Sequence, residues 1–291
     1  IINKVFDVNF LITLDKSISK TKSLYFDLED YYNSKKINII KVKTINSKKI
    51  IDIVKKNNID YIFQLDWSEK FSNELINSPN KMCVGLHPSP LPKGRGAAIL
   101  NWKIILREYG NWGCSLFKMD NNFDSGPIIA TEKFIIDKND DIQTLYSKFY
   151  EVSKIIFKNN SIKILNNNFI LKPNNSSKYK YYKRRTPDQS IISFSWSSER
   201  ILCYYKALKY PFPNIYFNTL DNLKINIFKV VLLNESYNYP CGEIVKLLKN
   251  NYLIVVVRNK RAIKIQVSKK DYNILKGVYR KGNSVNFKLS S

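Results

Sequence analysis

One short segment of the chain combines an ionisable imidazole with a stiff backbone. It reads Gly85-Leu-His-Pro-Ser-Pro-Leu-Pro-Lys-Gly-Arg-Gly96 and contains His87, the only histidine among the 291 residues. Its three prolines fix φ, and its later glycines permit close approach of the backbone to a ligand. Because an imidazole exchanges protons near neutral pH, the segment predicts a general acid–base site. A structural loop with an exposed histidine is the alternative interpretation.

A second loop carries carboxylates that could act on this histidine. It reads Met119-Asp-Asn-Asn-Phe-Asp-Ser-Gly126 and offers Asp120 and Asp124. If both loops lie at the same rim of a sheet, one carboxylate could orient or charge His87. Asp, Asn and Gly also form ordinary turns, so these residues alone leave both interpretations open.

The first half of the chain alternates apolar runs with segments of helical period. This alternation predicts a parallel sheet with helices on both faces, in which ligands bind beyond the carboxyl ends of the strands. The segment with His87 begins where one predicted strand ends, which places it at that rim. The predicted strands are Val8–Leu14, Ile37–Val42, Tyr61–Leu65, Met82–Leu86, Gly113–Met119 and Pro127–Phe134, and the predicted helices are Ser23–Asn33, Ser47–Asn57, Phe71–Ile76, Ala97–Leu106 and Leu145–Leu165.

The second half of the chain differs in composition. Residues 171–190 are rich in Pro, Asn, Ser and basic residues, which is typical of a linker. We therefore expect a catalytic domain at 1–170, a linker at 171–190 and a β-rich, barrel-like domain at 191–291. In that last domain the predicted elements are the helix Ser198–Leu208 and the strands Asn214–Phe217, Lys224–Leu233, Gly242–Leu248, Tyr252–Arg258 and Ala262–Val267.

Composition excludes several classes of protein. The chain has 48 Lys+Arg against 24 Asp+Glu, a net charge of +24, yet 44% of its residues are hydrophobic, so it is not a disordered polyelectrolyte. The four cysteines form no C-x-x-C pair, and with one histidine they argue against a disulfide scaffold and against a zinc site. We therefore expect a reducing, cytoplasmic location and no bound metal. We also expect no membrane span, because the aliphatic runs are too short to cross a bilayer.

The two loops together resemble the signature of the folate-dependent formyltransferases. The resemblance lies in His87–Gly96, Asn101-Trp102, Met119-Asp120 and Phe123–Gly126, and it continues at Lys183–Asp188. It implies a Rossmann-like, doubly wound parallel sheet followed by a small C-terminal OB-like β-barrel domain. The family domain normally opens with a strand and helix before the segment matched to Val8–Leu14, so we expect a first strand to be missing. A homodimer is one assembly to expect.

The resemblance also implies roles for single residues. His87 would transfer protons while a formyl group moves from 10-formyltetrahydrofolate to a primary amine, and Asp124 would hold and tune it. Most family members carry an asparagine as oxyanion donor where this chain has Gly85, and losing such a donor costs about 10²–10³ in rate. A charged His87 or a bound water could substitute. The expected folate-contacting residues are Ser89, Pro90, Leu91, Pro92, Met119 and Asp120.

Three functions remain open from the sequence. A nucleotide-linked amino sugar of the 4-amino-4,6-dideoxyhexose type is the favoured acceptor, because the motif reads His-Pro-Ser-Pro and the loop Asp15–Ser23 is short. Charged initiator tRNA is the alternative, because residues 171–291 hold 23 basic and 6 acidic side chains, a net +17. A Lys-rich composition explains that charge equally well. The third interpretation is a degenerate, non-catalytic binding module, which Gly85 would suit.

Overall fold

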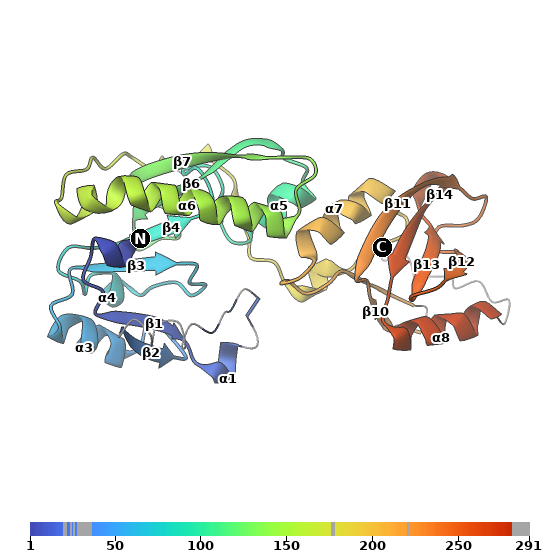
Figure 1. The fold of residues 1–291 in the computed structure, drawn as a ribbon, viewed down its shortest axis with the longest axis horizontal. Helices are drawn as coiled ribbons and strands as arrows, with labels where there is room; N and C mark the ends of the chain where they lie inside the picture. The colour runs from blue at the N-terminus through green and yellow to red at the C-terminus, as the bar shows by residue number, and fades with distance from the viewer. Residues whose placement is uncertain are drawn as a thin grey trace. The chain divides into compact units, whose positions relative to one another are not determined.

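The computed structural model describes residues 1–19, 22, 23, 25, 27, 37–175, 178–219 and 221–280 (Figure 1). The helix predicted within Ser23–Asn33 falls mostly outside these residues. The chain divides into two compact units. The first comprises residues 1–99, 109–137 and 144–184, and the second comprises residues 100–108, 138–143 and 185–291.

The first unit is an α/β structure that contains two sheets. Strands β1 (Phe10–Leu14) and β2 (Asn38–Val42) pair in parallel. A four-stranded sheet has the order β3-β4-β6-β7, in which β3 and β4 are parallel and β6 and β7 run antiparallel to their neighbours. These strands are β3 (Tyr61–Leu65), β4 (Met82–His87), β6 (Gly110–Lys118) and β7 (Ile128–Ile136).

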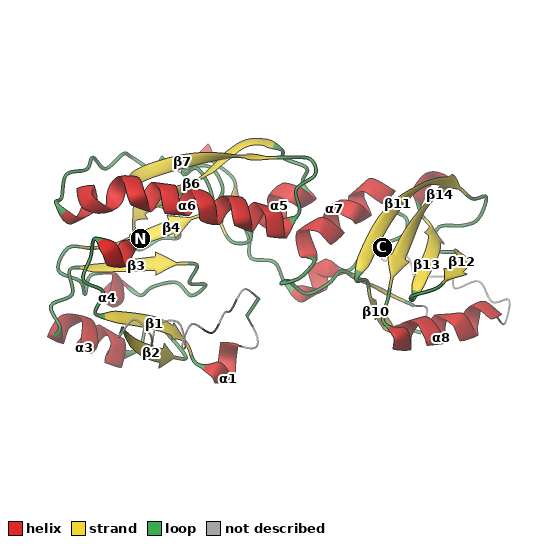
Figure 2. Ribbon diagram, viewed as in Figure 1, coloured by secondary structure: helices red, strands yellow, loops and turns green. Residues whose placement is uncertain are grey.

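The helices of this unit are drawn in red in Figure 2. The longer ones bury one apolar face, as their sequence period predicts. Helix α3 (Lys48–Lys56) buries Ile50, Ile51 and Val54 in a core that also includes Cys83 of β4. Two further short helices are α1 (Lys16–Ser19) and α4 (Asn73–Ile76). The predicted strands β1 to β4 lie within two residues of the observed bounds, and the hairpin β6–β7 is longer than predicted.

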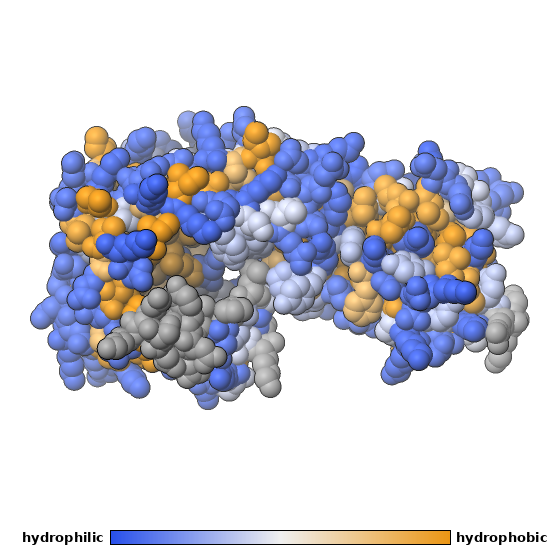
Figure 3. Space-filling view, in the orientation of Figure 1, coloured by the Kyte–Doolittle hydropathy of each residue, from blue (hydrophilic) through white to orange (hydrophobic). Residues whose placement is uncertain are grey.

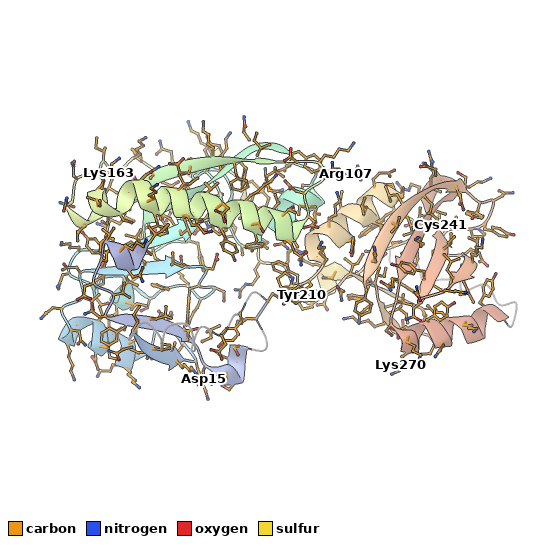
Figure 4. All side chains as sticks on the ribbon, in the orientation of Figure 1. Asp15, Arg107, Lys163, Tyr210, Cys241 and Lys270 are labelled. Atoms are coloured by element: carbon orange, nitrogen blue, oxygen red, sulfur yellow. The ribbon has the colours of Figure 1, made fainter. Side chains whose placement is uncertain are left out.

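Helix α6 (Ile142–Leu165) is the longest element of the chain. Leu145, Phe149 and Ile156 on its inner face are fully buried, whereas Ile162 on the opposite face is 60% exposed. The helix packs against β3, because the hydroxyl of Tyr61 donates to the carbonyl of Ile164 over 2.8 Å. Lys163 in its last turn is labelled in Figure 4. The predicted long amphipathic helix is confirmed.

The second unit is rich in strands. It contains the hairpin β9 (Tyr216–Asn218) with β10 (Lys224–Asn226) and a four-stranded antiparallel sheet of order β11-β14-β13-β12. The strands of that sheet are β11 (Lys229–Ser236), β12 (Ile244–Leu248), β13 (Tyr252–Val256) and β14 (Arg261–Gln266). Helix α7 (Ser198–Leu208) has the predicted bounds, and helix α5 (Ile99–Ile105) spans the division between the units.

Two features of this unit differ from prediction. The predicted strand Lys224–Leu233 is two strands, because the chain changes partners between them: the amide of Ile227 donates to Ile215 and that of Phe228 donates to Gln266. Helix α8 (Lys269–Arg280) was not predicted. Its apolar residues Tyr272, Leu275 and Tyr279 do recur at helical spacing, so the sequence carried a signal for this helix.

The part of the predicted linker up to residue 184 belongs to the first unit and contributes a short strand. β8 (Tyr181–Tyr182) pairs in parallel with β5 (Arg95–Gly96), and the 3-10 helix η3 (Pro187–Ser190) follows. A Cβ on Gly96 would lie 2.0 Å from the carbonyl oxygen of Tyr182, so only glycine allows this approach. β8 thus pairs with the end of the segment Gly85–Gly96, which contains His87.

Exposed apolar side chains are spread over both units among hydrophilic ones (Figure 3). In the described part of the chain, no helix is long and apolar enough to cross a membrane.

Gly126 sets the shape of the β6–β7 loop, and its substitution tests the fold. A Cβ there would lie 1.8 Å from the carbonyl oxygen of Lys118, so Gly126→Ala must open the hairpin. We expect a loss of about 1–3 kcal/mol in the free energy of unfolding, measured by urea denaturation. Gly277→Ala, where nothing lies within 4 Å and the residue is helical, is the matched control and should be neutral or stabilising. Equal stability of the two variants would contradict this packing.

Candidate active site

His87 is the last residue of β4, at the edge where the parallel strands β3 and β4 both end. All six residues of β4 are buried, and the strand lies between β3 and β6. Leu65, the last residue of β3, pairs with Leu86, so the segment that follows β3 begins beside His87. This is the carboxyl edge at which α/β sheets bind ligands. The buried strand thus delivers the histidine to the predicted rim.

Both ring nitrogens of His87 face hydrogen-bond acceptors. Nε2 lies 2.8 Å from the carbonyl oxygen of Gly94, and Nδ1 lies 3.5 Å from Oδ1 of Asp124. Both side chains are largely buried. A neutral imidazole has one N–H and can satisfy one of these acceptors, whereas an imidazolium satisfies both. The structure therefore places an acceptor beside each ring nitrogen.

Asp124 is held in place from three directions. Its backbone is left-handed, with φ of 51°, a region that Asp tolerates better than most residues. Its Oδ2 accepts from the amide of Gly96 over 2.9 Å. The side-chain amide of Asn174 donates to the carbonyls of Asp124 and Gly126, each over 2.9 Å. The two loops predicted from sequence therefore meet, and Asp124 is the carboxylate that reaches the ring.

Asp120 is engaged within its own loop. Its Oδ1 accepts from the amide of Asn122 over 3.1 Å and from the hydroxyl of Ser125 over 2.6 Å. These contacts are those of a turn-forming aspartate. Its expected contact with folate, like that of Met119, stays a prediction.

The proline-rich loop after β4 turns two of its predicted contact residues inward. Ser89 is fully buried and Leu91 is 5% exposed. The hydroxyl of Ser115 fastens the loop, because it donates to the carbonyl of Ser89 and accepts from the amide of Leu91. Pro90 and Pro92 are partly exposed. The loop can therefore offer a ligand its backbone and its prolines, but not the side chains of Ser89 and Leu91.

Packing explains why position 85 carries glycine. Gly85 pairs with Phe117 of β6, and a Cβ at 85 would lie 2.5 Å from Cε1 of that ring and 3.2 Å from Cγ of Met119. Phe117 belongs to an apolar cluster with Leu91 and Ile128. The space in which an asparagine amide would lie is thus filled by an apolar wall.

Asp66 is a second acidic residue at the site, and the sequence-based candidates do not include it. It follows β3 directly and has a left-handed backbone, with φ of 56°. Asp66 keeps contact with solvent, but the protein around its carboxyl group removes enough water to raise its pKa to about 6. The nearby His87 and a hydrogen bond from the hydroxyl of Tyr150 oppose that rise in pKa. In the sequence, the signal that could have identified Asp66 was its position directly after the predicted strand Tyr61–Leu65.

Two cations contact Phe123, which precedes Asp124 and has an exposed ring. The ammonium of Lys70 lies 5.7 Å from the centroid of the ring. The guanidinium of Arg95 donates to the carbonyl oxygen of Phe123 through Nε over 3.0 Å. Arg184 donates to the carbonyl of Ser68 over 3.0 Å. Positive charge therefore gathers on the loops around the His87–Asp124 pair.

Within the described ranges, no group of three or more His, Cys, Asp and Glu side chains is placed to hold a metal ion.

Comparison with known families decides what kind of protein carries this site. The model described as formyl transferase matches residues 19–160, and the model described as formyl transferase, C-terminal domain, matches residues 184–277. The chain belongs to the formyl transferase family. The predicted family and fold class are confirmed, including the strand-rich unit that follows the α/β unit of this formyltransferase.

Individual relatives differ in the function that their names record. The bifunctional polymyxin resistance protein ArnA of Wigglesworthia glossinidia brevipalpis is 30% identical over 240 residues, which cover 82% of this chain and 36% of ArnA. The methionyl-tRNA formyltransferase of Clostridioides difficile is 27% identical over 239 residues, covering 82% of this chain and 76% of that protein.

One solved structure shares the fold. It is an N-formyltransferase from Helicobacter canadensis, in complex with folinic acid and dTDP-3-aminofucose. It superposes with a TM-score of 0.57 at 23% identity and covers 85% of each chain. At this level of identity the likeness shows the fold alone.

The wall beside Gly85 predicts the result of restoring the asparagine. We expect Gly85→Asn to lower the free energy of unfolding by about 1–3 kcal/mol, because the new side chain must displace Phe117. In a double-mutant cycle measured by urea denaturation, the substitution should cost less when Phe117→Ala is also present. Additive effects of the two substitutions would contradict the proposed clash.

Proposed function

We propose that this formyltransferase transfers the formyl group of 10-formyltetrahydrofolate to the primary amine of a nucleotide-linked amino sugar, of the 4-amino-4,6-dideoxyhexose type. The observation that carries the proposal is the His87–Asp124 pair, held at the carboxyl end of β4 by contacts from Gly96 and Asn174. Formyl transfer requires one proton to reach the folate nitrogen and protons to leave the amine. A buried imidazole beside a carboxylate suits that exchange.

The described residues fit a folate at this place. The backbone of the proline-rich loop and the partly exposed Pro90, Pro92 and Met119 are available to contact a flat ring system, whereas Leu91, Phe117 and Ile128 pack as a buried apolar cluster. The side chains of His87 and Asp124 suit this reaction, because transfer of a formyl group between two nitrogens needs a proton donor and no metal.

His87 and Asp124 have different roles in this reaction. The carboxylate of Asp124 lies 3.5 Å from Nδ1, where it can orient the ring and stabilise the positive charge that proton transfer would place on it. Nε2–H, which donates to Gly94 in this structure, is the proton that the ring can give to the leaving nitrogen. The same N–H stabilises the oxyanion that forms on the formyl carbon, in place of an asparagine at position 85.

Cations near Phe123 support a nucleotide-linked acceptor. Lys70 and Arg95 contact Phe123, Arg184 contacts Ser68, and Lys70 and Arg184 are exposed. A diphosphate carries charge that a small group of cations can neutralise, and the exposed ring of Phe123 can stack on a base. The Helicobacter canadensis structure holds a dTDP-linked sugar whose amine is at position 3, so it shares the nucleotide-linked class but not the position of the amine.

Charged initiator tRNA is the second candidate acceptor. The net charge of +17 over residues 171–291 and the similarity to a methionyl-tRNA formyltransferase favour it. Lys178, Lys180 and Lys183 alternate with tyrosines in the segment that forms β8, where phosphates and bases could bind.

An assay of formyl transfer distinguishes these acceptors. The full chain is incubated with 10-formyltetrahydrofolate and either a panel of dTDP-, UDP- and GDP-linked 3- and 4-amino sugars or charged initiator tRNA. We expect formylation of at least one 4-amino sugar nucleotide and none of tRNA. Formylation of tRNA, together with binding that weakens steeply with salt, would support the second candidate. Folate binding without transfer to any acceptor would identify a binding module.

Substitution of the pair tests the roles of its members. His87→Ala and Asp124→Ala should each lower kcat by about 10²–10⁴, because proton transfer or its orientation is lost. Far-UV circular dichroism should show an unchanged fold. Asp137→Asn, an exposed carboxylate that pairs with Lys148, is the control and should keep wild-type turnover. Near-wild-type kcat in either alanine variant would refute the assigned roles.

A further inference from the structure

Asp66 lies where an acceptor amine would meet His87. β3 ends at Leu65, which pairs with Leu86 of β4. Asp66 therefore follows β3 beside His87, the next residue of the neighbouring strand. The turn is fixed by the side-chain amide of Gln64, which donates to the carbonyl of Trp67 over 2.8 Å. The carboxylate of Asp66 interacts electrostatically with His87 and accepts the hydroxyl of Tyr150 from α6. A second acidic group thus acts on His87 from the end of β3.

The reaction needs a proton acceptor that the His87–Asp124 pair does not provide. An alkylamine is an ammonium ion near neutral pH and cannot attack a carbonyl until it loses a proton. In this structure both nitrogens of His87 face acceptors, and both oxygens of Asp124 are engaged, by Nδ1 of His87 and by the amide of Gly96. With the ring held in this way to serve the leaving nitrogen, the first proton of the ammonium group calls for a separate base.

We propose that Asp66 binds the ammonium group of the acceptor and accepts its first proton. This inference rests on the proposed formyl transfer and names the group that selects the amine. Asp66 keeps solvent access, whereas Asp124 is largely buried, so an incoming cation can reach it. Tyr150 holds the carboxylate by one hydrogen bond, and a carboxylate has capacity for further donors.

The proton balance closes with these groups. The ammonium gives one proton to Asp66, and the free amine forms a bond to the formyl carbon. His87 gives its Nε2 proton to the folate nitrogen as the bond between that nitrogen and the formyl carbon breaks. The new amide nitrogen returns its extra proton to His87, and Asp66 releases its proton to solvent. The products are the formamide, tetrahydrofolate and one proton.

The groups that face Asp66 define its pH range. His87 faces it from β4, and Tyr146 and Tyr150 face it from α6. Loss of hydration raises its pKa to about 6, so the carboxylate is ionised and able to act as a base above that pH and is protonated below it. Its protonated form can neither bind an ammonium ion nor take its proton. The fall in activity on the acid side of the pH profile should therefore follow the protonation of Asp66.

Kinetics of Asp66→Asn test the proposal. With a nucleotide-linked amino sugar as acceptor, we expect kcat/KM to fall about 10²-fold, with a rise in the KM of the acceptor. The acid limb near pH 6 should disappear from the pH profile, and Asp66→Glu should recover part of the activity. Asp60→Asn is the matched control, because Asp60 precedes the opposite end of β3 and pairs with Lys81. It should keep wild-type kinetics.

Binding measurements separate this role from a structural one. By isothermal titration calorimetry, the wild type should prefer the amino sugar nucleotide to its 4-hydroxy analogue, and Asp66→Asn should lose that preference. The affinity for folinic acid should be the same in both proteins. Wild-type kcat/KM in Asp66→Asn, or an equal loss of affinity for folinic acid and both sugar nucleotides, would overturn the proposal. If the wild type binds folinic acid but formylates no amine, the proposed function itself fails.

Discussion

The contact between His87 and Asp124 is the interaction on which the proposed chemistry of the first unit depends. The two residues are 37 positions apart, and hydrogen bonds from Arg95 and Gly96 to the 119–126 loop bring them together. Asn174 also holds that loop, and the carbonyl of Gly94 lies beside the other nitrogen of the ring. The imidazole is thereby held between two acceptors, in an orientation suited to passing a proton to a leaving nitrogen.

Much of this arrangement follows from local sequence. The sequence of β4 is a continuous apolar run because both faces of the strand are buried. In α3 and α6 the apolar residues recur at helical spacing because each helix buries one face. Parallel strands end at one rim, so the position of His87 just after an apolar run was sufficient to locate the site. The pairing with Asp124 needed one further step, the assumption that the second loop reaches the same rim.

Other features depend on contacts between residues distant in sequence. Gly85 is explained by the ring of Phe117 across the β4–β6 pair, which no local pattern records. Asp66 resembles a turn residue until His87 and Tyr150 are placed beside it. The division of Lys224–Leu233 into two strands depends on Ile215 and Gln266, the backbone partners of the residues between them.

A double-mutant cycle on kcat tests the central contact most directly. Residues that act as one unit lose little further activity when the second member is removed after the first. We therefore expect the double variant His87→Ala/Asp124→Ala to have nearly the kcat of His87→Ala alone. Independent losses, which would multiply in the double variant, would contradict an account in which His87 acts through the carboxylate 3.5 Å from its Nδ1.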